Sequence, residues 1–138
     1  MTKDISTLLQ LEDFAKDLSS RLQPGDVVFL KGDLGAGKTT FTQFLIKSLG
    51  YDKRVKSPTY AIYETYNLDK ATVYHIDLYR IGNQEEIYYL GIDDIFNGEN
   101  IVIIEWPERG NSVLPEPSMI ITFELLKNKK RIVNLHIT

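Results

Sequence analysis

The chain has 138 residues, 16 of them basic and 19 acidic, and its formal net charge of −3 argues against strong nucleic-acid binding without a partner. Hydrophobic residues make up 43% and charged residues 25%, a balance typical of a folded protein, and the length predicts a single domain over residues 1–138. The lack of cysteine excludes disulfides, thiolate metal sites and cysteine nucleophiles, and the short apolar runs exclude a transmembrane helix, which needs about 20 residues.

The first half of the chain predicts a short strand, a helix, a buried strand and a second helix. Residues 3–7 suit an edge strand, and apolar residues at helical spacing predict an amphipathic helix over 11–22, which a Pro-Gly pair ends. Residues 27–30, Val-Val-Phe-Leu, form the continuous apolar run typical of a strand buried on both faces. A glycine-rich turn follows, and the next apolar residues predict a helix that closes near Gly50.

The second half predicts mainly strands. They are expected at 61–66, 72–77, 101–104, 119–125 and 131–137, with turns at 67–71 and 127–130 and a short helix at 84–90. Two pairs of these strands are close enough in sequence to form hairpins. We therefore expect an α/β fold, a three-layer sandwich around a mixed sheet, in which antiparallel hairpins are added to a parallel strand–helix–strand core.

Residues 32–39 match G-x-x-x-x-G-K-S/T, the phosphate-binding loop (P-loop), and lie where this motif requires, between a buried strand and a helix. Glycines let consecutive backbone N–H groups point at an anion, and the helix behind them presents its positive dipole end. We expect Lys38 to reach the β- and γ-phosphates, Thr39 to bind Mg²⁺, and Thr40 to lie by the α-phosphate. The expected nucleotide-binding residues of this P-loop NTPase-like fold are Gly32, Asp33, Leu34, Gly35, Ala36, Gly37, Lys38, Thr39 and Thr40.

Two carboxylates end strands that should lie beside this loop. Glu105 follows the apolar run 101–104, and Asp77 ends the strand at 72–77. A magnesium site beside a phosphate loop needs acids in such places, so both are candidates for the magnesium shell or for orienting water. His75 shares a strand face with Asp77, and we interpret it as a hydrogen-bonded structural residue. Trp106 suits either the core or a contact with nucleotide or partner.

Ser57, Pro58 and Thr59 lie in the loop after the helix of the phosphate-binding motif. In nucleotide switches, a threonine in such a loop reaches Mg²⁺ and the γ-phosphate and becomes ordered only with the triphosphate. Thr59 is therefore a candidate catalytic residue. Arg80 and Arg109 are interpreted as surface charges.

Several segments agree with one known pattern. They are residues 32–40 (Gly-Asp-Leu-Gly-Ala-Gly-Lys-Thr-Thr), 55–60 (Val-Lys-Ser-Pro-Thr-Tyr), 75–80 (His-Ile-Asp-Leu-Tyr-Arg), 90–96 (Leu-Gly-Ile-Asp-Asp-Ile-Phe) and 104–109 (Ile-Glu-Trp-Pro-Glu-Arg). In their order and spacing they resemble the TsaE family, formerly YjeE, and Leu114-Pro115 matches a Leu-Pro near that family's C-terminal hairpin. The resemblance covers nearly the whole chain.

The resemblance implies a small P-loop ATPase of bacterial tRNA modification, which serves the formation of threonylcarbamoyladenosine beside the anticodon. In this family a TsaD–TsaB heterodimer transfers the threonylcarbamoyl group, and TsaE binds that dimer and hydrolyses ATP to reset it between turnovers. The resemblance also implies that Thr39 and Glu105 bind Mg²⁺, that Asp77 is a second essential acid, and that Ser6 and Thr7 lie by the nucleotide base. Lys38, Asp77, Glu105 and Thr59 are then the expected catalytic residues, with Asp77 a further candidate metal ligand.

The expected ligands are accordingly Mg²⁺ and, as the substrate, ATP. The expected partner is the TsaD–TsaB heterodimer, with tRNA engaged only indirectly and no membrane involved. We further expect a cytoplasmic protein that is a monomer or a weak dimer when isolated.

Other classes of P-loop protein stay open as alternatives. A small-molecule kinase needs a lid with several arginines, whereas this chain has only five, scattered along its length. GTPase switches usually carry Asn-Lys-x-Asp, and the nearest stretch, residues 128–131 (Asn-Lys-Lys-Arg), lacks the aspartate, so adenine is favoured. A subunit that binds nucleotide without hydrolysing it would have little use for two acids near the metal.

Overall fold

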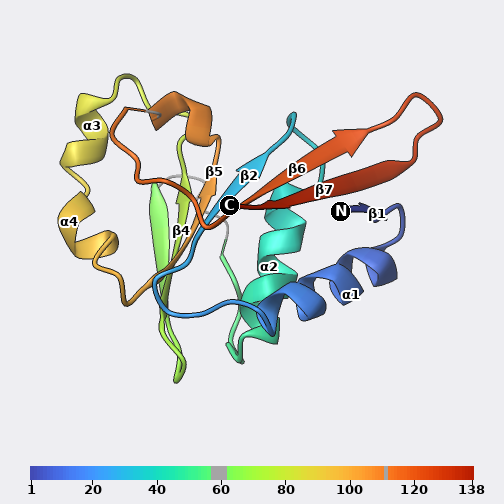
Figure 1. Ribbon diagram of the computed structural model, residues 1–138, viewed down its shortest axis with the longest axis horizontal. Coiled ribbons are helices and arrows are strands. Elements are labelled where there is room, and N and C mark those ends of the chain that lie inside the picture. The colour runs from blue at the N-terminus through green and yellow to red at the C-terminus, as the bar shows by residue number, and fades with distance from the viewer. Residues whose placement is uncertain (57–61, 111) are drawn as a thin grey trace.

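The computed structural model describes residues 1–56, 62–110 and 112–138, which form a mixed sheet flanked by helices (Figure 1). The elements are β1 (Thr2–Asp4), α1 (Leu8–Ser19), β2 (Val27–Lys31), α2 (Lys38–Ser48), β3 (Tyr63–Asn67), β4 (Thr72–Asp77), α3 (Glu85–Tyr88), α4 (Ile92–Ile95), β5 (Ile101–Glu105), the 3-10 turn η1 (Pro107–Gly110), β6 (Met119–Leu125) and β7 (Arg131–Ile137). No helix in these described ranges is long and apolar enough to cross a membrane.

The sheet has the strand order β1-β7-β6-β2-β5-β4-β3. Its four central strands, β6, β2, β5 and β4, run parallel, whereas β7, β1 and β3 are antiparallel to their neighbours. The last residues of the parallel strands therefore meet at one edge, where Glu105 is in register with both Leu30 and Asp77. The expected mixed α/β sheet with antiparallel additions is confirmed.

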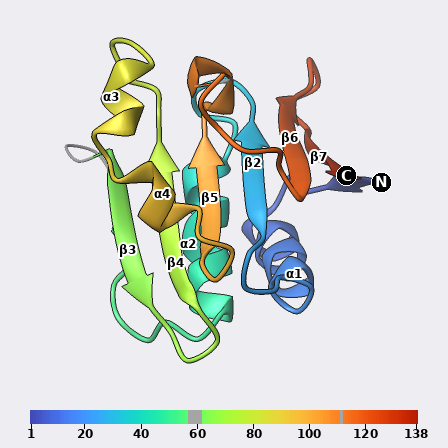
Figure 2. The same ribbon diagram turned by 60° about the vertical axis from the view of Figure 1, so that its left-hand side comes forward.

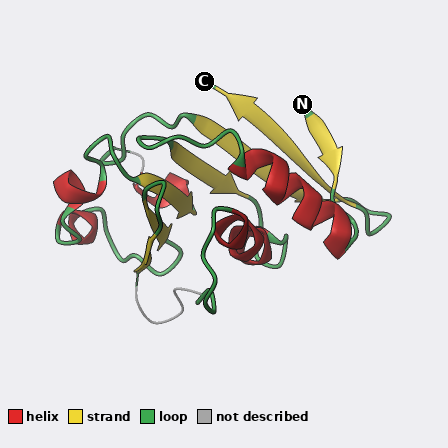
Figure 3. Ribbon diagram, turned by 90° about the horizontal axis from the view of Figure 1, so that it is seen from below, coloured by secondary structure: helices red, strands yellow, loops and turns green. Residues whose placement is uncertain are grey.

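Helices cover both faces of the sheet (Figures 2 and 3). On one face, α1 and α2 pack side by side, with the rings of Phe14 and Phe41 5.4 Å apart. The short helices α3 and α4 cover the other face through Ile87 and Ile95. The central strand β2 serves both cores, because its alternate side chains, such as Val28 and Phe29, point to opposite faces. The layers follow from strands that are apolar on both sides.

The ends of several elements differ from those expected. Helix α1 begins at Leu8 rather than at residue 11, because Thr7 and Gln10 form a reciprocal capping box with hydrogen bonds of 3.1 and 2.9 Å. The hairpin strands expected at 119–125 and 131–137 are confirmed at those bounds. Helix α4 and η1 have no counterpart among the expected elements, since four residues are too few to show a helical period.

Candidate functional site

The phosphate-binding loop joins β2 to α2 and is shaped by its glycines. Gly32 has φ of +143°, and a Cβ there would lie 2.7 Å from the backbone oxygen of Phe123 on β6, so only glycine lets the loop lie this close to the neighbouring strand. Gly37, at the N-cap of α2, has φ of +110° and makes no side-chain cap. The first backbone N–H groups of α2 are therefore left for a ligand.

A pocket of about 350 Å³ lies in front of this loop. It is lined by Leu34, Gly35, Gly37, Lys38, Thr39, Thr40, Asp77, Tyr79, Glu105, Trp106 and Arg131. The structure thus brings the loop, the two strand-end acids and Trp106 together, as the sequence analysis expected. Gly32, Asp33 and Ala36 instead line a second hollow of about 470 Å³, formed with Leu34 and the end of β6.

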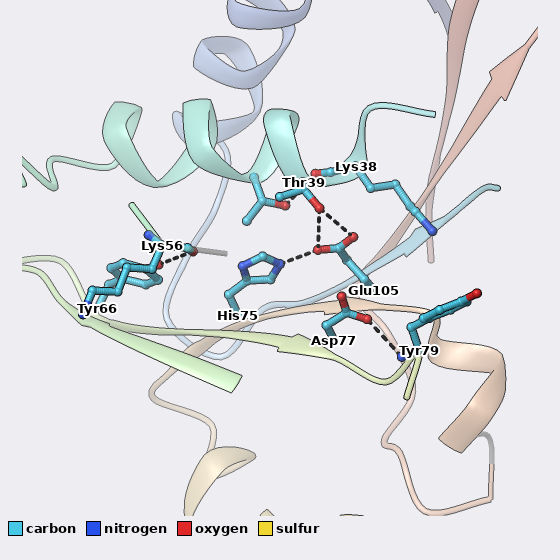
Figure 4. Close-up of polar contacts among 9 residues, drawn as sticks. Lys38, Thr39, Lys56, Tyr66, His75, Asp77, Tyr79 and Glu105 are labelled. Carbon is cyan, nitrogen blue, oxygen red and sulfur yellow. Dashed lines mark hydrogen bonds and ion pairs between the residues drawn. The ribbon is translucent and has the colours of Figure 1, made fainter. Parts of the chain in front are cut away.

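Glu105 lies at the centre of the polar contacts in this pocket (Figure 4). Its side chain is 2% exposed and lies between Thr39 of α2 and His75 of β4. The Thr39 hydroxyl is 3.4 and 3.5 Å from its two carboxylate oxygens, and Nε2 of His75 is 2.6 Å from one of them. The expectation of a hydrogen-bonded His75 is confirmed, with Glu105 as the partner.

Asp77 ends β4 beside Glu105, and its carboxylate faces the same pocket. The backbone N–H of Tyr79 donates a 3.0 Å hydrogen bond to it, which fixes one oxygen. Burial raises the pKa of Asp77, and the nearby charge of Glu105 adds to this rise, while the hydrogen bond from Tyr79 opposes it. The site therefore holds two acids whose negative charges repel each other.

Lys38 is the cation of the pocket and is only 5% exposed. Its ammonium donates to the backbone oxygen of Gly32 and lies 3.8 Å from the centroid of the Trp106 ring. Burial lowers the pKa of Lys38, and the charge of Glu105 is the largest opposing influence. Trp106 has a positive φ of 59° and stacks at 4.9 Å on Tyr79, so the tryptophan is a wall of the pocket rather than a core residue.

Some expected residues lie elsewhere. Thr7 caps α1, and the Ser6 hydroxyl accepts a 3.0 Å hydrogen bond from the backbone N–H of Arg131; neither side chain lines the pocket, and their place beside the base stays a prediction. Thr59 lies outside the described residues. Tyr79 and Arg131 line the pocket but were not singled out. Tyr79 lies within the segment 75–80 that carries the resemblance, whereas no sequence pattern marks Arg131.

Comparison with known proteins decides the family. The model of the family "Threonylcarbamoyl adenosine biosynthesis protein TsaE" matches residues 5–133. The chain belongs to the TsaE family. The resemblance seen in its motifs is therefore confirmed, and with it the family's role in the biosynthesis of threonylcarbamoyladenosine in tRNA.

Individual TsaE proteins support this membership. The tRNA threonylcarbamoyladenosine biosynthesis protein TsaE of Haemophilus influenzae is 42% identical over 77% of this chain and 67% of its own length. The protein of the same name from Rickettsia prowazekii is 40% identical over 92% of this chain and 88% of its own. Among solved structures, Bacillus subtilis YdiB superposes with a TM-score of 0.83 at 30% identity, covering 99% of this chain and 84% of that one.

Proposed function

We propose that this TsaE-family protein binds ATP with Mg²⁺ and hydrolyses it slowly, as an accessory of the TsaD–TsaB transferase. The observation that carries the proposal is the approach of Thr39 to Glu105, with 3.4 Å between the nearest oxygens, directly behind a phosphate-binding loop. A hydroxyl at the start of the loop's helix and a strand-end carboxylate are the protein oxygens that P-loop NTPases offer to magnesium.

The donor atoms fit magnesium better than a metal that needs a protein cage. Within the described ranges, no group of three or more His, Cys, Asp and Glu side chains could hold a metal ion. Magnesium requires only one or two protein carboxylates, because water and substrate phosphates complete its shell. Thr39 and Glu105 would hold the ion, with Asp77 beside them. When bound, the ion would neutralise charge on the β- and γ-phosphates.

The chain's own residues account for the rest of the reaction. The open backbone N–H groups at the start of α2 and the ammonium of Lys38 would bind the phosphates, and both would stabilise the charge that spreads over the transferred phosphoryl group. Asp77, fixed through the N–H of Tyr79, would orient the attacking water. Thr40 would lie by the α-phosphate. These assignments keep the roles expected from the loop motif.

The partner proposal rests on family membership and on the loop at 57–59. We propose that the triphosphate orders Ser57 to Thr59 and creates a surface for TsaD–TsaB, which hydrolysis then releases. Binding would be tighter with a non-hydrolysable ATP analogue than with ADP. Equal binding to the heterodimer with the analogue, with ADP and without nucleotide would contradict this. The tRNA would be engaged only through the heterodimer.

The first experiment is to measure ATP and GTP hydrolysis with Mg²⁺, with and without purified TsaD–TsaB. We expect slow, ATP-selective turnover that the heterodimer changes. Lys38→Ala and Glu105→Ala should abolish turnover while the far-UV circular dichroism stays unchanged. Lys47→Ala is the matched control, because Lys47 is an exposed lysine of the same helix outside the pocket. Wild-type rates in either pocket variant would contradict the site, and a preference for GTP would contradict the proposed substrate.

A further inference from the structure

His75 has a contact that a residue placed only for packing would not need. It is 1% exposed and lies on β4, where it is in register with Ile103 of β5, two residues before Glu105. Both side chains point to the face covered by α2, and Nε2 lies 2.6 Å from Oε2 of Glu105 (Figure 4). The two buried groups are therefore joined directly across neighbouring parallel strands.

The other ring nitrogen of His75 defines where the proton lies. Nδ1 is fully buried and has no hydrogen-bond partner among the residues that the structure describes. A carboxylate can only accept, so the proton of the shared hydrogen bond is carried by Nε2, and Nδ1 holds an unused lone pair. An apolar side chain would fill this space without leaving a buried nitrogen unsatisfied. The contact with Glu105 is thus the feature that requires histidine here.

We propose that His75 is a positioning residue of the magnesium site. Its Nε2–H holds one oxygen of Glu105, so that the carboxylate keeps facing the Thr39 hydroxyl instead of turning toward the ammonium of Lys38. His75 itself touches neither metal nor nucleotide. The inference rests on the proposed function, since it assumes that Thr39 and Glu105 hold the ion. Hydrogen-bond partners of metal-binding carboxylates typically change metal affinity or activity by about 10–100-fold when they are removed.

Three substitutions separate positioning from packing. In His75→Gln, the side-chain amide reaches the place of Nε2 and can still donate to Glu105. In His75→Asn, the shorter amide reaches only the place of Nδ1, and His75→Leu has no donor. Metal affinity is measured with ADP present, through Mn²⁺ binding followed by electron paramagnetic resonance. Affinity for ADP in excess EDTA reports the phosphate-binding loop alone.

We expect His75→Gln to bind Mn²⁺ within about threefold of the wild type, and His75→Asn and His75→Leu to bind it about 10–100-fold more weakly. All three should bind ADP in EDTA as the wild type does. Wild-type metal affinity in His75→Asn would overturn the inference, as would an equal loss of metal-free ADP binding in all three variants. If the wild type binds no metal, the proposed function fails as well, and this outcome is distinct from unchanged variants of a metal-binding protein.

A measurement on the unmodified protein does not depend on how the variants fold. The chain has two histidines, so ¹H–¹⁵N correlation spectra of the imidazole rings can be assigned with a single His136 variant. We expect a neutral His75 ring protonated at Nε2. A ring protonated at Nδ1 would overturn the inference, because Nε2 could then not donate to Glu105.

Discussion

The ammonium of Lys38 lies over the face of Trp106, 3.8 Å from the ring centroid. The same ammonium donates to the backbone oxygen of Gly32, so two groups of the protein occupy it while the pocket holds no phosphate. Cation–π contacts strengthen when the cation is withdrawn from water, and this lysine is buried. A phosphate that binds Lys38 must therefore compete with both Trp106 and Gly32.

This competition predicts an optical signal of nucleotide binding. Trp106 is the only tryptophan in the chain, so its fluorescence reports this contact alone. Binding of ADP with Mg²⁺ should change the emission as the ammonium moves from the ring to the phosphates. Lys38→Ala should already show altered emission without nucleotide and a smaller change on adding it, whereas Lys47→Ala should behave as the wild type. Identical emission from free wild-type and Lys38→Ala proteins would contradict the importance of the contact.

Asp77→Asn should make the protein more stable and less active. The pKa of Asp77 is raised, chiefly by burial, so the native state binds this proton more readily than the unfolded chain does. Stability therefore falls as the pH rises through the raised pKa, and at neutral pH the ionised carboxylate destabilises the fold. Asparagine removes the charge and can still accept from the N–H of Tyr79. If Asp77 orients the attacking water, ATP turnover should drop by about 10²–10⁴-fold.

Thermal unfolding at two pH values checks the sign of this effect. The melting temperature of Asp77→Asn should exceed that of the wild type near neutral pH, and the difference should shrink toward about pH 4, where the wild-type carboxyl takes up its proton. Asp13→Asn, which changes an exposed carboxylate on α1, is the control and should leave the activity unchanged. A less stable Asp77→Asn at neutral pH would contradict the argument.

The parts of the site that lie on one continuous pattern could be predicted from the sequence, and the parts that depend on register could not. The apolar runs before Gly32 and Glu105 mark buried strands, so the loop and the strand-end acid follow directly. That His75 meets Glu105 depends on how β4 and β5 are aligned, which no local pattern encodes. The placement of Trp106 over Lys38 needs a positive φ that sequence preferences do not indicate for tryptophan.

Gly32→Ala should weaken the fold more than an equivalent change at Gly50. Both glycines have positive φ, +143° and +114°, but only a Cβ at Gly32 would meet another backbone atom, the oxygen of Phe123 at 2.7 Å. Backbone strain of this kind costs about 1–3 kcal/mol, and the contact with β6 adds to it only at Gly32. Urea unfolding should give the larger loss for Gly32→Ala, together with weaker ADP binding. Equal losses in the two variants would show that the close approach to β6 is unimportant.

Arg131 should contribute to nucleotide binding, although it lies on β7, far along the chain from the phosphate-binding loop. Its side chain lines the same pocket as Thr40, and its backbone is held by the Ser6 hydroxyl and by the N–H of Ile5, at 3.0 and 2.8 Å. A guanidinium offers a planar set of donors suited to phosphate oxygens. Loss of a hydrogen bond to a charged group costs about 1.5–3 kcal/mol, so Arg131→Ala should weaken ADP binding by about 10–100-fold.

Variants around Arg131 test whether its side chain or only its charge matters. Arg131→Lys keeps the charge without the planar fork and should bind ADP with intermediate affinity. Arg54→Ala removes an exposed arginine outside the pocket and should bind ADP as the wild type does. Ser6→Ala should weaken binding less than Arg131→Ala, because it loosens only the anchor of the arginine's backbone. Isothermal titration calorimetry of ADP with Mg²⁺ would measure all four, and equal affinities for Arg131→Ala and Arg54→Ala would exclude a contact between Arg131 and the nucleotide.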